Sequence, residues 1–273
     1  MRKISDAVIR YPLFSFFVLT FFLSWLAGFP AVIFHDWPGI IAFMMSFAPA
    51  LAAVIILSIS EKKSGVLALI ESLRIWRVRW YWYVIILAGP AFTMLVTVLV
   101  FWGMGKLSVD ESFPLFHLSG SHILVLVVVF LYQLVVVWGE ELGWRGFALP
   151  RLQQRFHPII AAVLLGLIWG IWHLPYFFMT DSVHANMSLT FFILSTVGYS
   201  IIYAWIYNGS KGSLLMMSLF HAANNTTVSF TMMFVPQIVD EPKITLMILM
   251  MFNGLIILFA GPKLLYKKDH LHC

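Results

Sequence analysis

Apolar runs long enough to cross a lipid bilayer recur along this chain of 273 residues. An α-helix rises 1.5 Å per residue, so about 20 consecutive apolar residues span the hydrocarbon core. Charged residues make up only 11% of the chain, against about 25% in a typical soluble domain. The runs are continuous, whereas the strands of a membrane barrel alternate apolar and polar residues. We therefore predict an all-α, integral, multi-pass membrane protein without a sizeable soluble domain.

The apolar runs predict about eight transmembrane helices. They cover residues 12–34, 37–60, 81–104, 121–150, 159–178, 189–207, 214–235 and 244–260. With the amino terminus inside, this arrangement places 15 of the 17 lysines and arginines on the inner side, all except Lys106 and Lys243. Because cytoplasmic loops are enriched in basic residues, both termini are predicted to be cytoplasmic.

The longest polar insertion, residues 61–79, carries apolar residues near one helical face with basic residues around them. This pattern predicts an amphipathic helix on an anionic membrane surface, and a solvated loop is the alternative. The net charge of +5 does not indicate nucleic acid binding, because the basic residues lie between membrane spans. A polar loop with Asp110 and Glu111 follows the third span, and a short basic tail follows residue 263. Membrane lipid is therefore a predicted partner.

An acidic motif follows the uncharged run 123–137. Glu141 and Arg145 are four residues apart with the acid first, which is the favoured order for an ion pair on a helix. Glu140 is rotated by about 100° and has no such partner. A carboxylate that is poorly solvated and uncompensated suits a general base. The alternative is an interfacial charge cluster without chemistry.

Two further polar motifs lie in later spans. Trp169 precedes His173 by one turn, so the two side chains share a helix face. His221 and Asn225 have the same spacing in the seventh span. The alternative for both motifs is polar packing between transmembrane helices.

Together, these motifs supply a carboxylate base, a histidine for proton handling and an amide donor for an oxyanion, as needed to activate water against a carbonyl. The only cysteine is Cys273, so a disulfide framework or a cysteine-based zinc site is excluded. The glutamates and histidines could also hold a divalent metal such as zinc, although an HExxH motif is absent. We predict no cofactor and keep the metal as an alternative.

The ordered set Glu140-Glu141-xxx-Arg145, Trp169-xxx-His173 and His221-xxx-Asn225 resembles the CPBP family. This family contains type II CAAX prenyl endopeptidases and bacteriocin-processing or immunity proteins. The resemblance implies an intramembrane glutamate-dependent endopeptidase acting on a peptide or lipidated protein substrate.

By the same resemblance, Glu140 activates the water and His173 assists. His221 and Asn225 stabilise the oxyanion or help to hold the water. Glu141, Arg145 and Trp169 order the site, and Trp169 stands where many members carry phenylalanine.

We therefore predict three parts. Residues 1–120 form amino-terminal membrane helices with the amphipathic insertion, residues 121–235 the catalytic core, and residues 236–273 the last helix and the tail. The active site is predicted to face the cytoplasmic side. The alternatives are a metal-dependent intramembrane protease, a non-catalytic scaffold or bacteriocin-immunity protein, and a transporter that uses the same carboxylates. Convergence of Glu140 and His173 requires tilted helices or a water-filled cavity, because they lie at different depths along their helices.

Overall fold

The computed structural model describes residues 2–34, 38–108, 117–180, 182–238 and 241–264, and within these ranges it contains helices and connecting turns but no strand. The predicted all-α class is confirmed. The helices of more than ten residues are α2 (Pro12–Phe34), α3 (Pro38–Ser60), α4 (Lys62–Ser72), α5 (Trp80–Gly103), α6 (Gly120–Gly143), α8 (Pro158–Trp172), α9 (Leu189–Gly209), α10 (Leu214–Phe234) and α11 (Pro242–Leu264). The predicted polar loop at Asp110 and Glu111 and most of the basic tail lie outside the described residues.

Seven helical segments in the described part of the chain are long and apolar enough to cross a membrane, which confirms a multi-pass membrane protein. Their bounds agree with the predicted spans to within three residues, except that the second segment begins at Phe43 and not at residue 37, although the helix α3 that contains it begins at Pro38. The predicted seventh span is the helix α10, but its histidine, asparagine and threonine residues lower its hydropathy, and it is not among the seven. The count of eight and the cytoplasmic placement of the termini stay predictions.

The fourth span continues as a helix past Pro150. α6 passes into a π-helical segment, η2 (Trp144–Ala148), and then into α7 (Leu149–Gln153). The span was expected to end within Pro150 and the basic residues 151–157, and α7 ends there, at Gln153; Pro150 itself lies in the first turn of α7, where its missing N–H costs little. The helical stretch Gly120–Gln153 has 34 residues, or about 51 Å at 1.5 Å each, which exceeds the thickness of a hydrocarbon core of about 30 Å.

The polar insertion at 61–79 is only partly helical. α4 ends at Ser72 and the chain continues in turns and extended backbone to Arg79, so a helix over the whole insertion is not present. Leu69 is buried against the protein, whereas Leu67 and Trp76 are exposed. The insertion is therefore docked on the helices along one edge.

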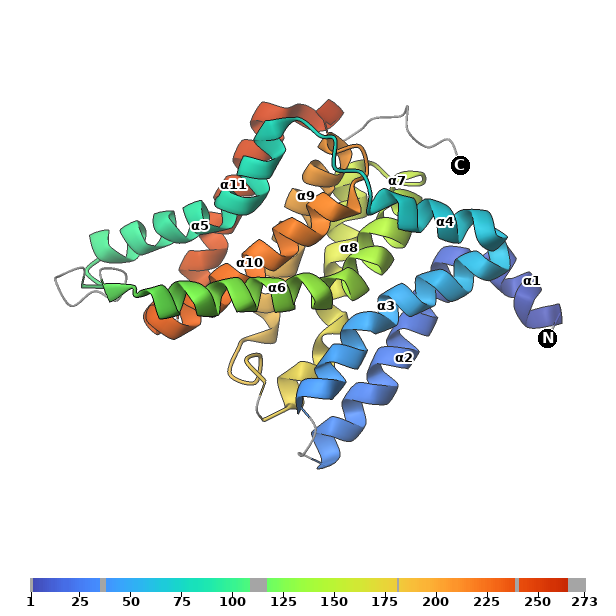
Figure 1. Ribbon diagram of the computed structural model, residues 1–273, viewed down its shortest axis with the longest axis horizontal. Helices are drawn as coiled ribbons and strands as arrows, with labels where there is room; N and C mark the ends of the chain where they lie inside the picture. Colours follow the sequence, from blue (N-terminus) through green and yellow to red (C-terminus); the bar gives the residue numbers. More distant parts are fainter. Residues whose placement is uncertain (1, 35–37, 109–116, 181, 239–240, 265–273) are drawn as a thin grey trace.

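The helix α6 crosses the molecule between the α2–α3 pair and the group formed by α5, α10 and α11, as Figure 1 shows. α6 packs extensively against α3 and α10, and α8 against α9. Two short 3₁₀ helices, η3 (Leu174–Phe178) and η4 (Pro236–Ile238), follow α8 and α10, and α1 (Arg2–Arg10) precedes α2.

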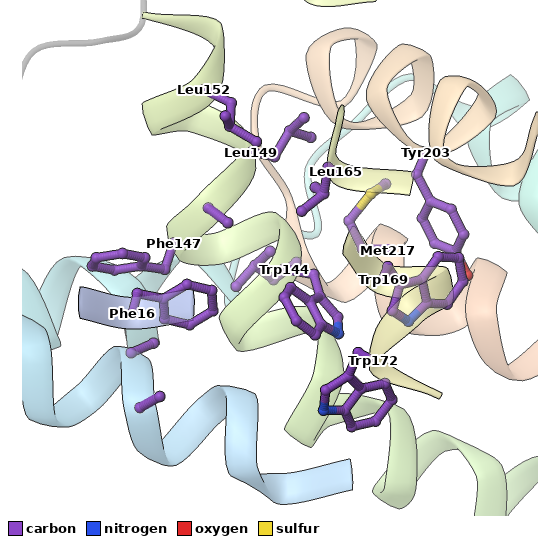
Figure 2. Packing of buried hydrophobic residues seen from close by; sticks show 14 of the residues in the cluster. Phe16, Trp144, Phe147, Leu149, Leu152, Leu165, Trp169, Trp172, Tyr203 and Met217 are labelled. Atoms are coloured by element: carbon purple, nitrogen blue, oxygen red, sulfur yellow. The ribbon is translucent and has the colours of Figure 1, made fainter. Parts of the chain in front are cut away.

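The core around the start of η2 is rich in aromatic rings (Figure 2). Trp144 is fully buried and its ring lies 5.7 Å from the rings of Phe16 and of Trp172. The indole of Trp172 donates a hydrogen bond of 2.6 Å to the buried hydroxyl of Ser24 on α2. These contacts join α2, η2 and α8 directly beside the acidic motif.

Candidate active site

The ion pair that the spacing predicts is present and buried. Arg145 Nη1 lies 2.8 Å from Glu141 Oε1, and both side chains are inaccessible to solvent. The same oxygen lies 2.7 Å from His221 Nδ1. Because an ionised carboxylate only accepts hydrogen bonds, Nδ1 of His221 carries the hydrogen and donates it to Glu141. The other ring nitrogen, Nε2, then keeps its lone pair if the imidazole is neutral.

Two aromatic rings enclose the guanidinium of Arg145. Its central carbon lies 3.8 Å from the ring centre of Tyr203 and 4.4 Å from that of Trp169. Cation–π attraction at a desolvated site of this kind contributes about 2 kcal/mol. The rings, together with Glu141, hold Arg145 in one place within the protein interior.

Glu140 points to a different partner. Its Oε2 accepts a hydrogen bond of 2.8 Å from the indole nitrogen of Trp169, and 6% of the residue is exposed. Adjacent glutamates thus have separate roles: Glu141 is bound by a cation and a histidine, while Glu140 is held by a neutral donor. The division that the helical spacing predicts between Glu141 and Glu140 agrees with these contacts.

The three predicted motifs meet at the indole of Trp169. It binds Glu140, and its ring lies 5.6 Å from the rings of both His173 and His221. Figure 2 shows Trp169 beside Tyr203, whose ring is 5.9 Å away. A single side chain from α8 therefore contacts side chains from α6, α9 and α10.

His173 directly follows α8, where the last turn gives way to η3. Its Nδ1 lies 2.7 Å from the backbone oxygen of Trp169. Since a carbonyl only accepts, Nδ1 carries the hydrogen and the Nε2 lone pair of the neutral ring is left available. Two rings from other elements pack on the imidazole, those of His184 at 5.8 Å and Phe192 at 5.0 Å.

Asn225 joins the site at its edge. Its Nδ2 donates a hydrogen bond of 3.1 Å to Gln133 Oε1 on α6. The structure links Asn225 to His221 through their shared face of α10, while Gln133 connects it to the helix that carries both glutamates.

Helix direction explains how residues at different depths converge. Glu140 lies near the middle of the stretch Gly120–Gln153 and not at its end. Figure 1 shows that α6 crosses the direction of α8, and the hydrogen bond from Trp169 to Glu140 joins the two helices. The crossing of α6 and α8 thus accounts for the contact between Glu140 and Trp169.

Two glycines set the distance between α6 and α3 at this point. A Cβ atom on Gly139 would meet the backbone of Ser46, and one on Gly143 would meet the backbone of Pro49. A small residue at every fourth position lets transmembrane helices approach closely. Gly139 and Gly143 flank the glutamate pair, so α6 and α3 approach each other closely at the level of Glu140 and Glu141.

Sequence reasoning missed three residues of this site. Gln133 is an amide in an apolar run, and that polarity is a signal that could have identified it. Tyr203 is fully buried against Arg145, His221 and Trp169, but one tyrosine among many carries no distinguishing pattern. His184 lies in the loop before α9, 11 residues after His173, and nothing in its spacing links the two histidines.

A zinc ion needs three protein ligands in a catalytic site. In the part of the chain that the structure describes, no group of three or more histidine, cysteine, aspartate or glutamate side chains is placed to hold a metal ion. Glu141 already binds Arg145 and His221 through one oxygen. The donor set therefore does not fit a three-ligand zinc site.

Comparisons with known proteins agree with the resemblance predicted from the motifs. The sequence model of the family described as "Type II CAAX prenyl endopeptidase Rce1-like" matches residues 122–227, a range that includes all seven predicted site residues. The chain is also similar to "CAAX prenyl protease 2" of Methanococcus maripaludis. The two are 28% identical over 268 residues, which is 93% of this chain and 92% of the relative.

Proposed function

We propose that the chain, which is similar to type II CAAX prenyl endopeptidases, is an intramembrane endopeptidase that cleaves a membrane-anchored, prenylated peptide or protein. The observation that carries this proposal is the convergence of the three motifs on Trp169. The convergence places a carboxylate and two imidazoles around one side chain. A packing role alone does not require that arrangement.

In the proposed reaction, Glu140 takes a proton from a water molecule, and the resulting hydroxide attacks the carbonyl carbon of the scissile bond. His221 helps to hold the water through the Nε2 lone pair that its bond to Glu141 leaves available. The amide of Asn225 donates to the oxyanion of the tetrahedral intermediate.

Collapse of the intermediate breaks the C–N bond, and the leaving amine receives the proton that Glu140 took up. His173 assists this transfer through its own Nε2, since its Nδ1 hydrogen is committed to the carbonyl of Trp169. Glu141, Arg145 and Trp169 keep these groups in place. From the distribution of basic residues, we place the active site toward the cytoplasmic side.

The test is hydrolysis of a peptide that ends in a farnesylated CAAX sequence by protein reconstituted in liposomes. We expect cleavage by the wild type and a loss of at least 10³-fold in kcat for Glu140→Gln, which keeps the shape of the side chain but removes the base. Glu71→Gln is the matched control, because it makes the same change at an exposed position on α4. Full activity of Glu140→Gln would refute the assignment.

Two additions to the assay separate the alternatives. Loss of wild-type cleavage with a chelator, restored by zinc, would favour the metal-dependent protease. If cleavage is absent and Glu140→Ala, His173→Ala and His221→Ala all retain function in cells, the scaffold or immunity role would replace the protease. Ion flux into proteoliposomes would support the transporter.

A further inference from the structure

Gln133 introduces an amide into an otherwise apolar part of α6. From residue 123 to residue 137, Tyr132 and Gln133 are the only residues with polar side-chain atoms. A glutamine in such a helix needs a hydrogen-bond partner, because lipid and apolar side chains offer none. The partner is Asn225, whose Nδ2 lies 3.1 Å from Gln133 Oε1.

The bond belongs to the main contact between α6 and α10. The two helices run antiparallel, and three side-chain contacts mark their register: Glu141 with His221, Gln133 with Asn225, and His122 with Phe234. The first two contacts are polar and each involves one of the two site residues of α10. Gln133 therefore has the same relation to Asn225 as Glu141 has to His221.

We infer that Gln133 is a positioning residue that fixes the orientation of the Asn225 amide for the oxyanion. This inference rests on the proposed function. The amide of Asn225 has two N–H hydrogens and one carbonyl oxygen. With Gln133 accepting one hydrogen, the second is available to the oxyanion. Without this acceptor the amide can turn by half a rotation and present its oxygen, which repels the developing negative charge.

The experiment measures kcat and KM for the farnesylated CAAX peptide in liposomes. We expect Gln133→Leu to lower kcat about tenfold with KM within twofold, since the oxyanion forms only in the transition state. Gln133→Glu offers an oxygen acceptor of the same length and should restore kcat to within about threefold of the wild type. Asn225→Ala removes the donor itself and should cost about 10²–10³-fold.

A double variant tests whether Gln133 acts through Asn225. In the Asn225→Ala background, Gln133→Leu should change kcat by less than twofold, because there is no amide left to orient. If Gln133 only packs, Gln133→Leu lowers kcat by the same factor in the wild type and in Asn225→Ala, and this result would overturn the inference. A rise in KM with unchanged kcat would overturn it as well. Thr226→Val is the control on α10, because the hydroxyl of Thr226 bonds to the carbonyl of Ala222 on its own helix.

The outcome also distinguishes this inference from the proposed function. If the wild type cleaves, Glu140→Gln does not, and Gln133→Leu equals the wild type, the proposed function stands and the role of Gln133 is refuted. If the wild type does not cleave, or Glu140→Gln cleaves equally fast, the proposed function fails, and the positioning role is overturned with it because no oxyanion forms at Asn225.

Discussion

His221 and His173 both contact the ring of Trp169, but their other neighbours differ in kind. His221 is 4% exposed and its Nδ1 binds the carboxylate of a buried ion pair. His173 is partly exposed, its Nδ1 binds a backbone carbonyl, and rings from the following loop and α9 pack on it. One histidine is held by charge and the other by aromatic packing.

The difference predicts how the surroundings of each histidine respond to substitution. Charges in the interior are stable only while both partners are present, because an unpaired buried ion loses its hydration without compensation. Aromatic contacts are individually weak and mutually replaceable, at about 0.5–1.5 kcal/mol for each pair. We therefore expect the surroundings of His221 to respond sharply to single substitutions and those of His173 to respond gradually.

The largest effect is expected for Glu141→Leu. Removal of this carboxylate leaves Arg145 buried without a counter-charge and His221 without its acceptor, at a cost of about 3–5 kcal/mol in the free energy of unfolding. Unfolding in detergent micelles measures it. The double variant Glu141→Leu/Arg145→Leu should be less destabilised than Glu141→Leu alone. If the double variant loses as much free energy of unfolding as Glu141→Leu and Arg145→Leu lose together, the two charges do not depend on one another.

The next effect concerns the residue that the two histidines share. Trp169→Phe keeps an aromatic ring near His173 and His221 but removes the N–H that binds Glu140. A hydrogen bond to a charged group contributes about 1.5–3 kcal/mol, so stability should fall by that amount. The kcat of peptide cleavage should fall as well, because Glu140 loses its fixed orientation. Trp172→Phe is the control, because the indole N–H of Trp172 binds Ser24 and not Glu140. It separates the loss of a buried N–H from the loss of the bond to Glu140.

A smaller effect is expected around His173, which is held by aromatic packing. His184→Ala removes one ring beside His173 and should cost about 1–2 kcal/mol, whereas His184→Phe preserves the packing and should cost less than half of that. The rate of peptide cleavage should also fall more in His184→Ala than in His184→Phe. Equal losses in both variants would show that the imidazole Nδ1, which lies 3.2 Å from Ser182 Oγ, matters more than the ring.

Acid pH tests the same contact in the wild-type protein. Burial lowers the pKa of His184 to about 4 from an ordinary value of 6.5. Between pH 6.5 and about 4 the unfolded chain therefore binds a proton at this position that the folded protein does not bind, so stability falls as the pH decreases through this window. His184→Phe should show a shallower decline over the same window. An identical decline in both proteins would assign the acid sensitivity to other groups.

Local features of this site could be predicted from the sequence, whereas contacts between distant segments could not. The pair Glu141 and Arg145 follows from helix periodicity, because both residues lie on one helix at a fixed spacing. The bounds of α2 follow from the length of its apolar run. The separate environment of Glu140 also followed from its rotation around the helix axis.

The unpredicted features depend on tertiary packing. Gln133 and Asn225 are 92 residues apart, and their bond exists only because α6 and α10 run antiparallel in one register. The π-helical segment and the continuation beyond Pro150 arise where η2 packs among α4, α8 and α10. A residue-by-residue propensity predicts a break at a proline, because proline lacks the donor that an ordinary helix needs. Here the wider turn before it and its place in the first turn of α7 make that donor dispensable.

The smallest effect is expected for an ion pair outside the site, and it tests whether burial explains the behaviour of Glu141 and Arg145. Lys106 and Glu241 form a salt bridge whose side chains are 40% and 38% exposed. Water and salt screen such a pair, so Lys106→Met should cost less than about 1 kcal/mol, and less again at high ionic strength. Unfolding of this variant and of Glu141→Leu at low and high salt is the measurement. A loss for Lys106→Met as large as that for Glu141→Leu would show that pairing itself, and not the exclusion of water, sets the stability of the charges around His221.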